Sequence, residues 1–215
     1  MKIEIWTDVV CPWCGLTTHR FNRALEQFEH ADDVEVVHRS FQLNPDAPVG
    51  AAEPTAQLLH RLRGVDTKQL TDSFALVEKI AHDEGVARYH VADNVIANTS
   101  LAHQFLAYAS TQGKHEEAWQ LVFEEYFGNR TPVWTIDDLL VLADRLDLDR
   151  DGVRAALESR VHEADVEADH NEALQLGANG VPFIVIDRRY AIPGSQKSEL
   201  IVNALRQAWA ESHPA

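Results

Sequence analysis

The stretch IEIWTDVVCPWC, residues 3–14, decides the fold of this chain. It begins with an apolar run typical of a β-strand and ends with Cys11 and Cys14, the only two cysteines among 215 residues. A helical pattern follows from about Leu16. Two thiols separated by two residues at a strand-to-helix junction favour dithiol chemistry. The first thiol would lie where unpaired helix N–H groups and the positive end of the helix dipole favour an anion, and the thiolate is the reactive form.

Two other readings of the cysteine pair carry less weight. A structural zinc site usually needs four ligands, and the sequence has no second cysteine pair to complete one. A purely structural disulfide would close a very short loop, which stabilises a protein little. We therefore expect a redox-active pair and no metal site.

The order of the expected elements defines an α/β fold with a long insertion. Residues 2–8 and 34–41 have strand patterns, and an apolar stripe of helical spacing lies between them. Helical patterns then dominate up to Leu176, with Thr135 as the N-cap of one helix. Strand patterns return at 183–186 and 190–192, followed by a terminal helix. We expect a discontinuous domain, 1–45 with 177–215, and an inserted all-helical domain, 46–176.

A second chemical signal stands directly before the third strand, at Gly180-Val181-Pro182. A proline suits the first residue of a strand because it cannot donate a ladder hydrogen bond. X-Pro bonds also tolerate the cis form at modest cost. Beside a C-x-x-C pair, we expect a cis Val181–Pro182 bond that leaves the Val181 backbone available to an extended peptide or a thiol ligand. An ordinary trans proline at a strand entrance is the alternative.

The chain resembles the thioredoxin-fold proteins of the DsbA type, and within them the FrnE-like group of cytoplasmic dithiol oxidoreductases. The resemblance implies a thioredoxin fold, β-α-β followed by β-β-α, interrupted by the helical insertion. It also implies that Cys11 attacks, that Cys14 resolves, and that Val181-Pro182 faces them. The segments that carry it span nearly the whole chain: 8–14 (DVVCPWC), 41–45 (FQLNP), 98–99 (NT), 102–103 (AH), 180–183 (GVPF) and 194–196 (GSQ).

The same superfamily includes 2-hydroxychromene-2-carboxylate isomerase and the kappa-class glutathione transferases. In those enzymes a serine stands where this chain has Cys11, and the second cysteine is missing. Two retained thiols favour an enzyme that reduces, forms or isomerises disulfides through a mixed disulfide. A glutathione-dependent isomerase or transferase, and a peptide-binding, chaperone-like module, remain the alternatives.

Five further residues are candidates for the site. Pro12 suits the first helical turn, and Trp13 could shield the sulfurs and offer a flat contact surface. Asp8 could relay protons, or it could be a solvated carboxylate at a strand end. His103 could border the groove, or it could be a hydrogen-bonded or surface histidine. Asn98 could contact a substrate backbone, or it could cap its helix.

Composition limits the partners. The net charge of −15 argues against binding nucleic acid through its phosphates. The N-terminus has no apolar signal segment, and no apolar run reaches membrane-spanning length. We expect a cytoplasmic protein without a resident cofactor, whose partners are protein or low-molecular-weight thiols and disulfides, with glutathione as a candidate co-substrate. A homodimer through an apolar face of the insertion is also an expectation.

Two acidic segments imitate metal sites. Asp147–Glu158 satisfies the EF-hand loop pattern, but Arg154 occupies a position usually held by an apolar residue, and Asp149 fits better as a helix N-cap. Asp165, Glu167, Asp169 and His170 form a second cluster, which we interpret as a solvated helix face.

Overall fold

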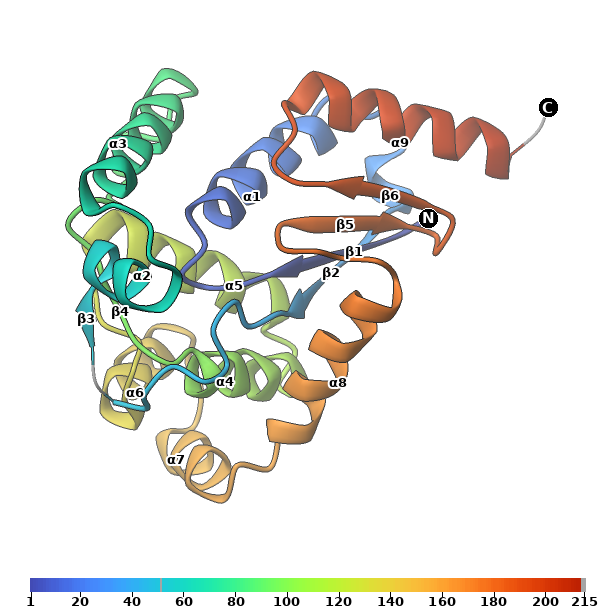
Figure 1. Ribbon diagram of the computed structural model, residues 1–215. Helices are drawn as coiled ribbons and strands as arrows, with labels where there is room; N and C mark the ends of the chain where they lie inside the picture. Colours follow the sequence, from blue (N-terminus) through green and yellow to red (C-terminus); the bar gives the residue numbers. More distant parts are fainter. Residues whose placement is uncertain (51, 214–215) are drawn as a thin grey trace. The chain divides into compact units, whose positions relative to one another are not determined.

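The computed structural model describes residues 1–50 and 52–213, and its internal contacts divide the chain into two compact units. The first unit joins Met1–Leu43 to the segment that starts at Glu167, and the second is Asn44–Val166. Figure 1 follows the chain through both units. The sequence predicts boundaries after residues 45 and 176, which are two and ten residues beyond the observed boundaries at Leu43 and Val166.

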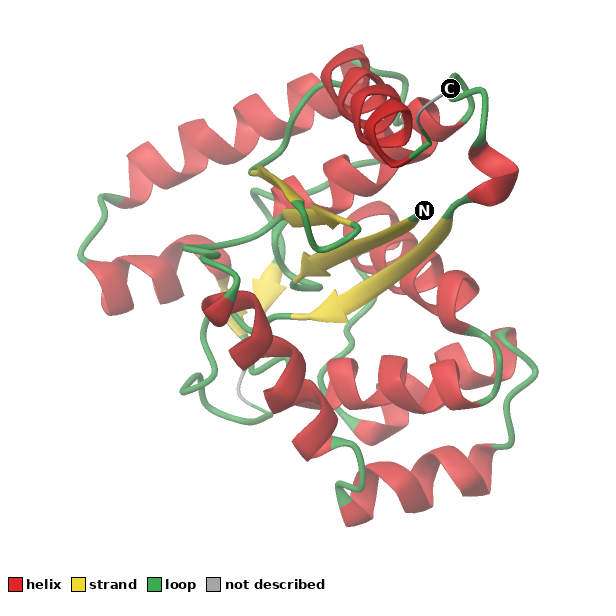
Figure 2. Ribbon diagram, turned by 90° about the vertical axis from the view of Figure 1, so that its right-hand side faces the viewer, coloured by secondary structure: helices red, strands yellow, loops and turns green. Residues whose placement is uncertain are grey.

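The first unit is built on a four-stranded sheet with the order β2-β1-β5-β6. Parallel β1 and β2 lie beside antiparallel β5 and β6, as the thioredoxin fold requires (Figure 2). In the register, Ile5 on the central strand lies opposite His38 on one side and Ile184 on the other. The strands are β1 (Lys2–Thr7), β2 (Glu35–Ser40), β5 (Phe183–Ile186) and β6 (Tyr190–Pro193).

The alternation of side chains along β1 gives the sheet two different faces, because successive residues of a strand point in opposite directions. Ile3 and Ile5 pack with α1 (Pro12–Leu25) and α9 (Ser198–Ser212) in one apolar cluster. Trp6 points to the other face, where it packs near Ala173 of α8 (Glu163–Gln175). Figure 1 shows α1 and α9 on one side of the strands and α8 on the other. A short 3₁₀ turn, Ala31–Asp33, precedes β2.

Glu4 on the α8 face is a buried carboxylate held between two arginines. Arg39 of β2 reaches it at 2.9 Å, and Arg188 of the β5–β6 turn pairs with it as well. The same two arginines pair with α8, Arg39 with Asp169 at 3.1 Å and Arg188 with Glu172 at 2.6 Å. Burial by itself would raise the pKa of the Glu4 carboxyl, but the hydrogen bonds and charges of the arginines outweigh it and lower that pKa. These ion pairs fasten the second half of α8 to the sheet, which explains why that half belongs to the first unit.

The second unit is mainly helical, as predicted, but it also contains a small sheet. Residues 53–54 and 95–96 pair as two antiparallel strands of two residues each, too short to leave a periodic pattern in the sequence. Helix α5 (His115–Phe123) continues into a π-helical turn, Glu124–Asn129. The elements are β3 (Glu53–Pro54), α2 (Thr55–Arg63), α3 (Thr67–Asp83), β4 (Val95–Ile96), α4 (Ser100–Thr111), α5 (His115–Phe123), α6 (Ile136–Arg145), α7 (Arg150–Ser159) and the first residues of α8.

Two helices of the second unit begin at the N-cap residues that the sequence predicts. The Thr135 side chain accepts a hydrogen bond from the Asp138 amide and forms a capping box at the start of α6. Asp149 caps α7 by accepting from the Gly152 amide at 2.9 Å, which confirms the N-cap interpretation of the EF-hand-like segment. Within the described ranges, no group of three or more His, Cys, Asp and Glu side chains is arranged to hold a metal ion. Nor is any helix of those ranges long and apolar enough to span a bilayer.

Candidate active site

The two thiols lie where β1 gives way to α1. Cys11 is the N-cap residue of α1 and Pro12 is its first residue, so the helix begins about four residues earlier than the sequence pattern indicated. The Cys14 amide donates to the Cys11 carbonyl at 2.9 Å, which closes the first turn around the motif. Both cysteines are free thiols in this structure. Both residues are buried: Cys11 is 4% exposed, and Cys14 is fully buried.

Burial makes the two sulfurs chemically unequal. It is the largest cause that raises the pKa of the Cys14 thiol well above its usual value, and the hydrogen bond and charge of Cys11 act in the same direction. A backbone hydrogen bond with Asp8 opposes the shift, while the charge of Asp8 adds to it. Cys14 is therefore held as a neutral thiol at physiological pH.

Asp8 is a buried carboxylate rather than the solvated strand-end group that was the alternative. Its Oδ2 atom accepts the amide of Leu43 at 2.7 Å. Its own carbonyl accepts the amide of Cys11 at 3.1 Å, which ties the end of β1 to the start of the motif. The structure thus brings Asp8 and both cysteines together.

The Val181–Pro182 element faces Cys11. The peptide bond between the two residues is cis. The Cys11 thiol donates to the Val181 carbonyl, with 3.6 Å between sulfur and oxygen. The Pro182 carbonyl in turn accepts the amide of Gly194, which joins this loop to the end of β6. The Cys11 sulfur therefore lies directly beside a backbone polar group of the element that the sequence singled out.

An open hollow of about 290 Å³ lies beside this element. Trp13 forms one wall and is 36% exposed, so it offers a flat aromatic surface. All five lining residues are uncharged: Trp13, Val181, Pro182, Gly194 and Ser195. Their chemistry suits an apolar or neutral ligand group.

Ser195, at the edge of the hollow, is held by two polar residues of α1 that sequence reasoning missed. Thr17 Oγ1 donates to Ser195 Oγ at 2.6 Å, and Arg20 Nη1 donates to the same oxygen at 3.0 Å. Both α1 residues are buried. They interrupt an apolar helix stripe, but this interruption can be interpreted only when their distant partner, Ser195, is known.

The two candidates from the insertion lie in the second unit. The Asn98 amide donates to the Pro45 and Ala47 carbonyls at 2.8 and 2.9 Å. Its Oδ1 accepts the Ser100 amide, so Asn98 holds a loop and the start of α4. His103 is fully buried, with its ring centroid 5.8 Å from that of Trp119.

A thioredoxin-like sheet with a dithiol at the start of its first helix, beside a proline loop, defines a class of thiol-exchange proteins. Residues 2–206 match the family described as the DSBA-like thioredoxin domain, and the chain belongs to that family. It is a thiol–disulfide oxidoreductase of the DsbA type.

Solved structures agree with this assignment. The "probable DsbA oxidoreductase SCO1869" of Streptomyces coelicolor is 37% identical, with a TM-score of 0.92 over 100% of this chain and 92% of the other. A 2-hydroxychromene-2-carboxylate isomerase matches at 0.75 and 13% identity, covering 99% and 98%. The cytosolic disulfide reductase DsbM of Pseudomonas aeruginosa, solved with GSH, matches at 0.59 and 18%, covering 96% and 100%. The last two likenesses show the fold alone.

Proposed function

We propose that the Cys-Pro-Trp-Cys dithiol exchanges disulfides through a mixed disulfide on Cys11. The observation that carries this proposal is the inequality of the two sulfurs. Cys11 caps α1 and contacts the carbonyl of Val181, a residue that lines the open hollow, whereas Cys14 is fully buried and its pKa is raised. A helix N-terminus favours the thiolate of its capping cysteine, which is the nucleophile of exchange.

In the reductive direction, the Cys11 thiolate attacks one sulfur of a substrate disulfide. The substrate S–S bond breaks, one thiolate leaves, and a mixed disulfide joins Cys11 to the other half. Cys14 then gives its proton to Asp8 and attacks the Cys11 sulfur. The second substrate thiolate leaves, and the enzyme holds a Cys11–Cys14 disulfide. The same steps in reverse oxidise a substrate dithiol to a disulfide and reduce the Cys11–Cys14 disulfide to two thiols.

The neighbouring residues serve this exchange in separate ways. Pro12 supplies a fixed φ at the first helical position, where its missing N–H costs nothing. The Val181 carbonyl lies beside the reacting sulfur, and Trp13 gives the substrate an aromatic surface. Asp8 takes the proton of Cys14 because it is the buried carboxylate whose charge acts on that thiol.

Insulin reduction tests the proposal. Cys11→Ser should abolish turnover, since the attacking sulfur is gone. Cys14→Ala should stop turnover as well but should trap substrate on Cys11, visible as a mass increase that dithiothreitol reverses. Turnover that survives in the Cys11→Ser, Cys14→Ala double variant would overturn the proposal and favour a glutathione-dependent isomerase or transferase. Equal suppression of client aggregation by that variant and the wild type, without turnover, would favour the chaperone-like module.

We further propose a cytoplasmic location, membership of the FrnE-like group, and glutathione as an electron donor. The P. aeruginosa protein of the same fold is a cytosolic reductase solved with GSH, and the chain here has no cysteines beyond the reactive pair. Equilibration of the Cys11–Cys14 couple against mixtures of reduced and oxidised glutathione tests the donor. A couple that glutathione leaves fully oxidised at every ratio would exclude it.

A further inference from the structure

The segment that leaves β2 runs between β1 and α8, and four successive amides in it have acceptors on these two elements. The Ser40 amide donates to Asp169 Oδ2 at 3.0 Å, and the Gln42 amide donates to His170 Nδ1 at 3.2 Å. The intervening Phe41 amide donates to the Thr7 carbonyl at 2.9 Å, and the Leu43 amide donates to Asp8 Oδ2 at 2.7 Å. Acceptors on α8 therefore alternate with acceptors at the end of β1.

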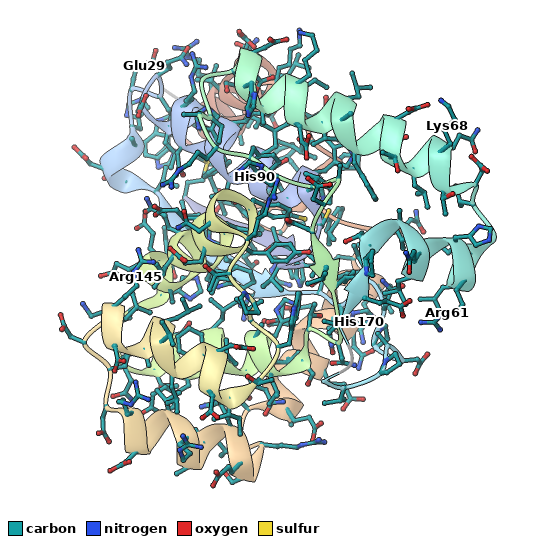
Figure 3. All side chains as sticks on the ribbon, turned by 90° about the vertical axis from the view of Figure 1, so that its left-hand side faces the viewer. Glu29, Arg61, Lys68, His90, Arg145 and His170 are labelled. Atoms are coloured by element: carbon teal, nitrogen blue, oxygen red, sulfur yellow. The ribbon has the colours of Figure 1, made fainter. Side chains whose placement is uncertain are left out.

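His170 makes two contacts with this segment. Besides accepting the Gln42 amide, its ring stacks on Phe41, with centroids 4.3 Å apart and planes at 29°. Figure 3 labels its side chain on α8. Accepting an N–H at Nδ1 requires a neutral imidazole that carries its proton on Nε2. Both contacts hold the Phe41–Gln42 peptide, which directly precedes the Leu43 amide that donates to Asp8.

The Leu43 amide matters because Asp8 is buried. A buried carboxylate depends on donated hydrogen bonds to stay in place. Asp8 can take a proton from Cys14 only if its carboxylate is held in a fixed position. Movement of the Gln42–Leu43 peptide would weaken that support without touching either sulfur.

We infer that His170 is a positioning residue that, through Gln42 and Leu43, holds Asp8 ready to accept the Cys14 proton. The inference rests on the proposed function, because only resolution by Cys14 uses that proton. It assigns His170 to the resolving step and leaves the attack by Cys11 independent of it. The charge of Asp8 also contributes to the raised pKa of Cys14, so the same segment influences how that thiol titrates.

The experiment separates the two steps with 5,5′-dithiobis(2-nitrobenzoate), followed at the absorbance of the released thiolate. Attack by the Cys11 thiolate breaks the reagent's S–S bond and releases one nitrothiobenzoate. Attack by deprotonated Cys14 on the Cys11 sulfur then releases a second and forms the Cys11–Cys14 disulfide. The two phases report attack and resolution in one trace.

Two substitutions divide the contacts of His170. His170→Phe keeps an aromatic ring against Phe41 but removes the acceptor, whereas His170→Asn keeps an acceptor near the Nδ1 position and removes the ring. We expect His170→Phe to slow the second phase on the order of tenfold near pH 7, less than the roughly 10²–10⁴-fold that a positioned general base contributes, because Asp8 itself remains. The deficit should shrink as pH rises, because hydroxide then replaces Asp8. The first phase should be unchanged, and His170→Asn should restore the second phase to within about twofold.

Further variants keep the outcome decisive. In an Asp8→Asn background, His170→Phe should cause no additional slowing, because its effect passes through Asp8. The same change at an exposed histidine of the second unit, His82→Phe, should leave both phases as in wild type. An unchanged second phase in His170→Phe, or equal slowing of both phases, would overturn the inference. A wild-type protein that releases no second equivalent would instead contradict the proposed function.

Discussion

Arg20 on α1 and Ser195 beyond β6 are joined by two hydrogen bonds across 175 residues of sequence, from Nη1 to the serine Oγ at 3.0 Å and to its carbonyl at 3.3 Å. Arg20 is 5% exposed, so its side chain is buried with this contact. The loop that closes one side of the hollow is therefore anchored to the helix that carries the thiols.

Arg20→Met should lower the free energy of unfolding by about 1–3 kcal/mol, since it leaves partly buried acceptors of Ser195 without their charged donor. Urea denaturation at pH 7 measures this. Arg23→Met, on the exposed side of the same helix, is the matched control and should change stability by less than about 0.5 kcal/mol. Equal losses in the two variants would show that the Ser195 contact contributes nothing.

The thiols should differ sharply in alkylation. With limiting iodoacetamide at pH 7.5, we expect modification of Cys11 while Cys14 stays unmodified, because Cys14 is buried and its pKa is raised. Peptide mass spectrometry gives the ratio, and alkylation in denaturant, where both should react alike, is the control. Preferential labelling of Cys14 in the folded protein would contradict the asymmetry on which the mechanism depends.

The raised pKa of Cys14 also predicts how reduced protein responds to alkaline pH. Below the unfolded-state value, about 8.5, both states hold the proton and the thiol leaves stability independent of pH. Above it the unfolded chain loses the proton first, so stability falls by up to about 1.4 kcal/mol per pH unit until the folded pKa is reached. Thermal unfolding between pH 7 and 10 under reducing conditions measures the decline. Cys14→Ser should flatten it, and an equally steep decline in that variant would assign it to other groups.

Glu4→Gln should be destabilising. Removing the carboxylate leaves Arg39 and Arg188 without their buried partner, but each keeps its carboxylate on α8, so we expect a loss of about 1–3 kcal/mol. Because the folded pKa of Glu4 is lowered, its contribution is present above the unfolded value of about 4.3 and is lost as pH falls through the folded value. Urea titrations at pH 7 and pH 3.5 should show a smaller difference between variant and wild type at the lower pH. Glu35→Gln, an exposed residue on β2, serves as the control.

Trp13→Ala should reduce kcat/KM for a protein disulfide about tenfold, mainly through KM, because a partly exposed aromatic wall of the hollow is lost. Stability should change little, since the side chain is not part of the core. Trp13→Phe, which keeps a flat ring, should recover most of the loss. A substrate-independent fall in kcat with unchanged KM would instead place Trp13 in the chemistry of the sulfurs.

Much of this site could be predicted because its signals are local. The C-x-x-C spacing, the strand before it and the proline before β5 each depend on a few neighbouring residues. The caps at Thr135 and Asp149 are equally local, since a cap bonds to amides within three residues. The order of elements followed from periodicity, which short strands such as β3 and β4 cannot display.

The second acidic cluster shows where sequence reasoning failed. The prediction of a solvated helix face is wrong for Asp169 and His170. Both side chains accept amides of the segment after β2, about 130 residues earlier in the chain. A pattern of charged residues along a helix does not reveal that one edge of it meets a sheet.

Spacing, turn chemistry and periodicity act over a few residues. The sequence alone therefore predicted the Cys11–Cys14 pair as the candidate redox site and the order of the strands and helices. Only the tertiary structure shows that Cys14 is buried and that the Leu43 amide donates to Asp8. It also shows that side chains of α8 accept amides at the end of β2. Burial and long-range hydrogen bonds depend on which distant segments meet. The chemical difference between two cysteines three positions apart is therefore a property of the fold.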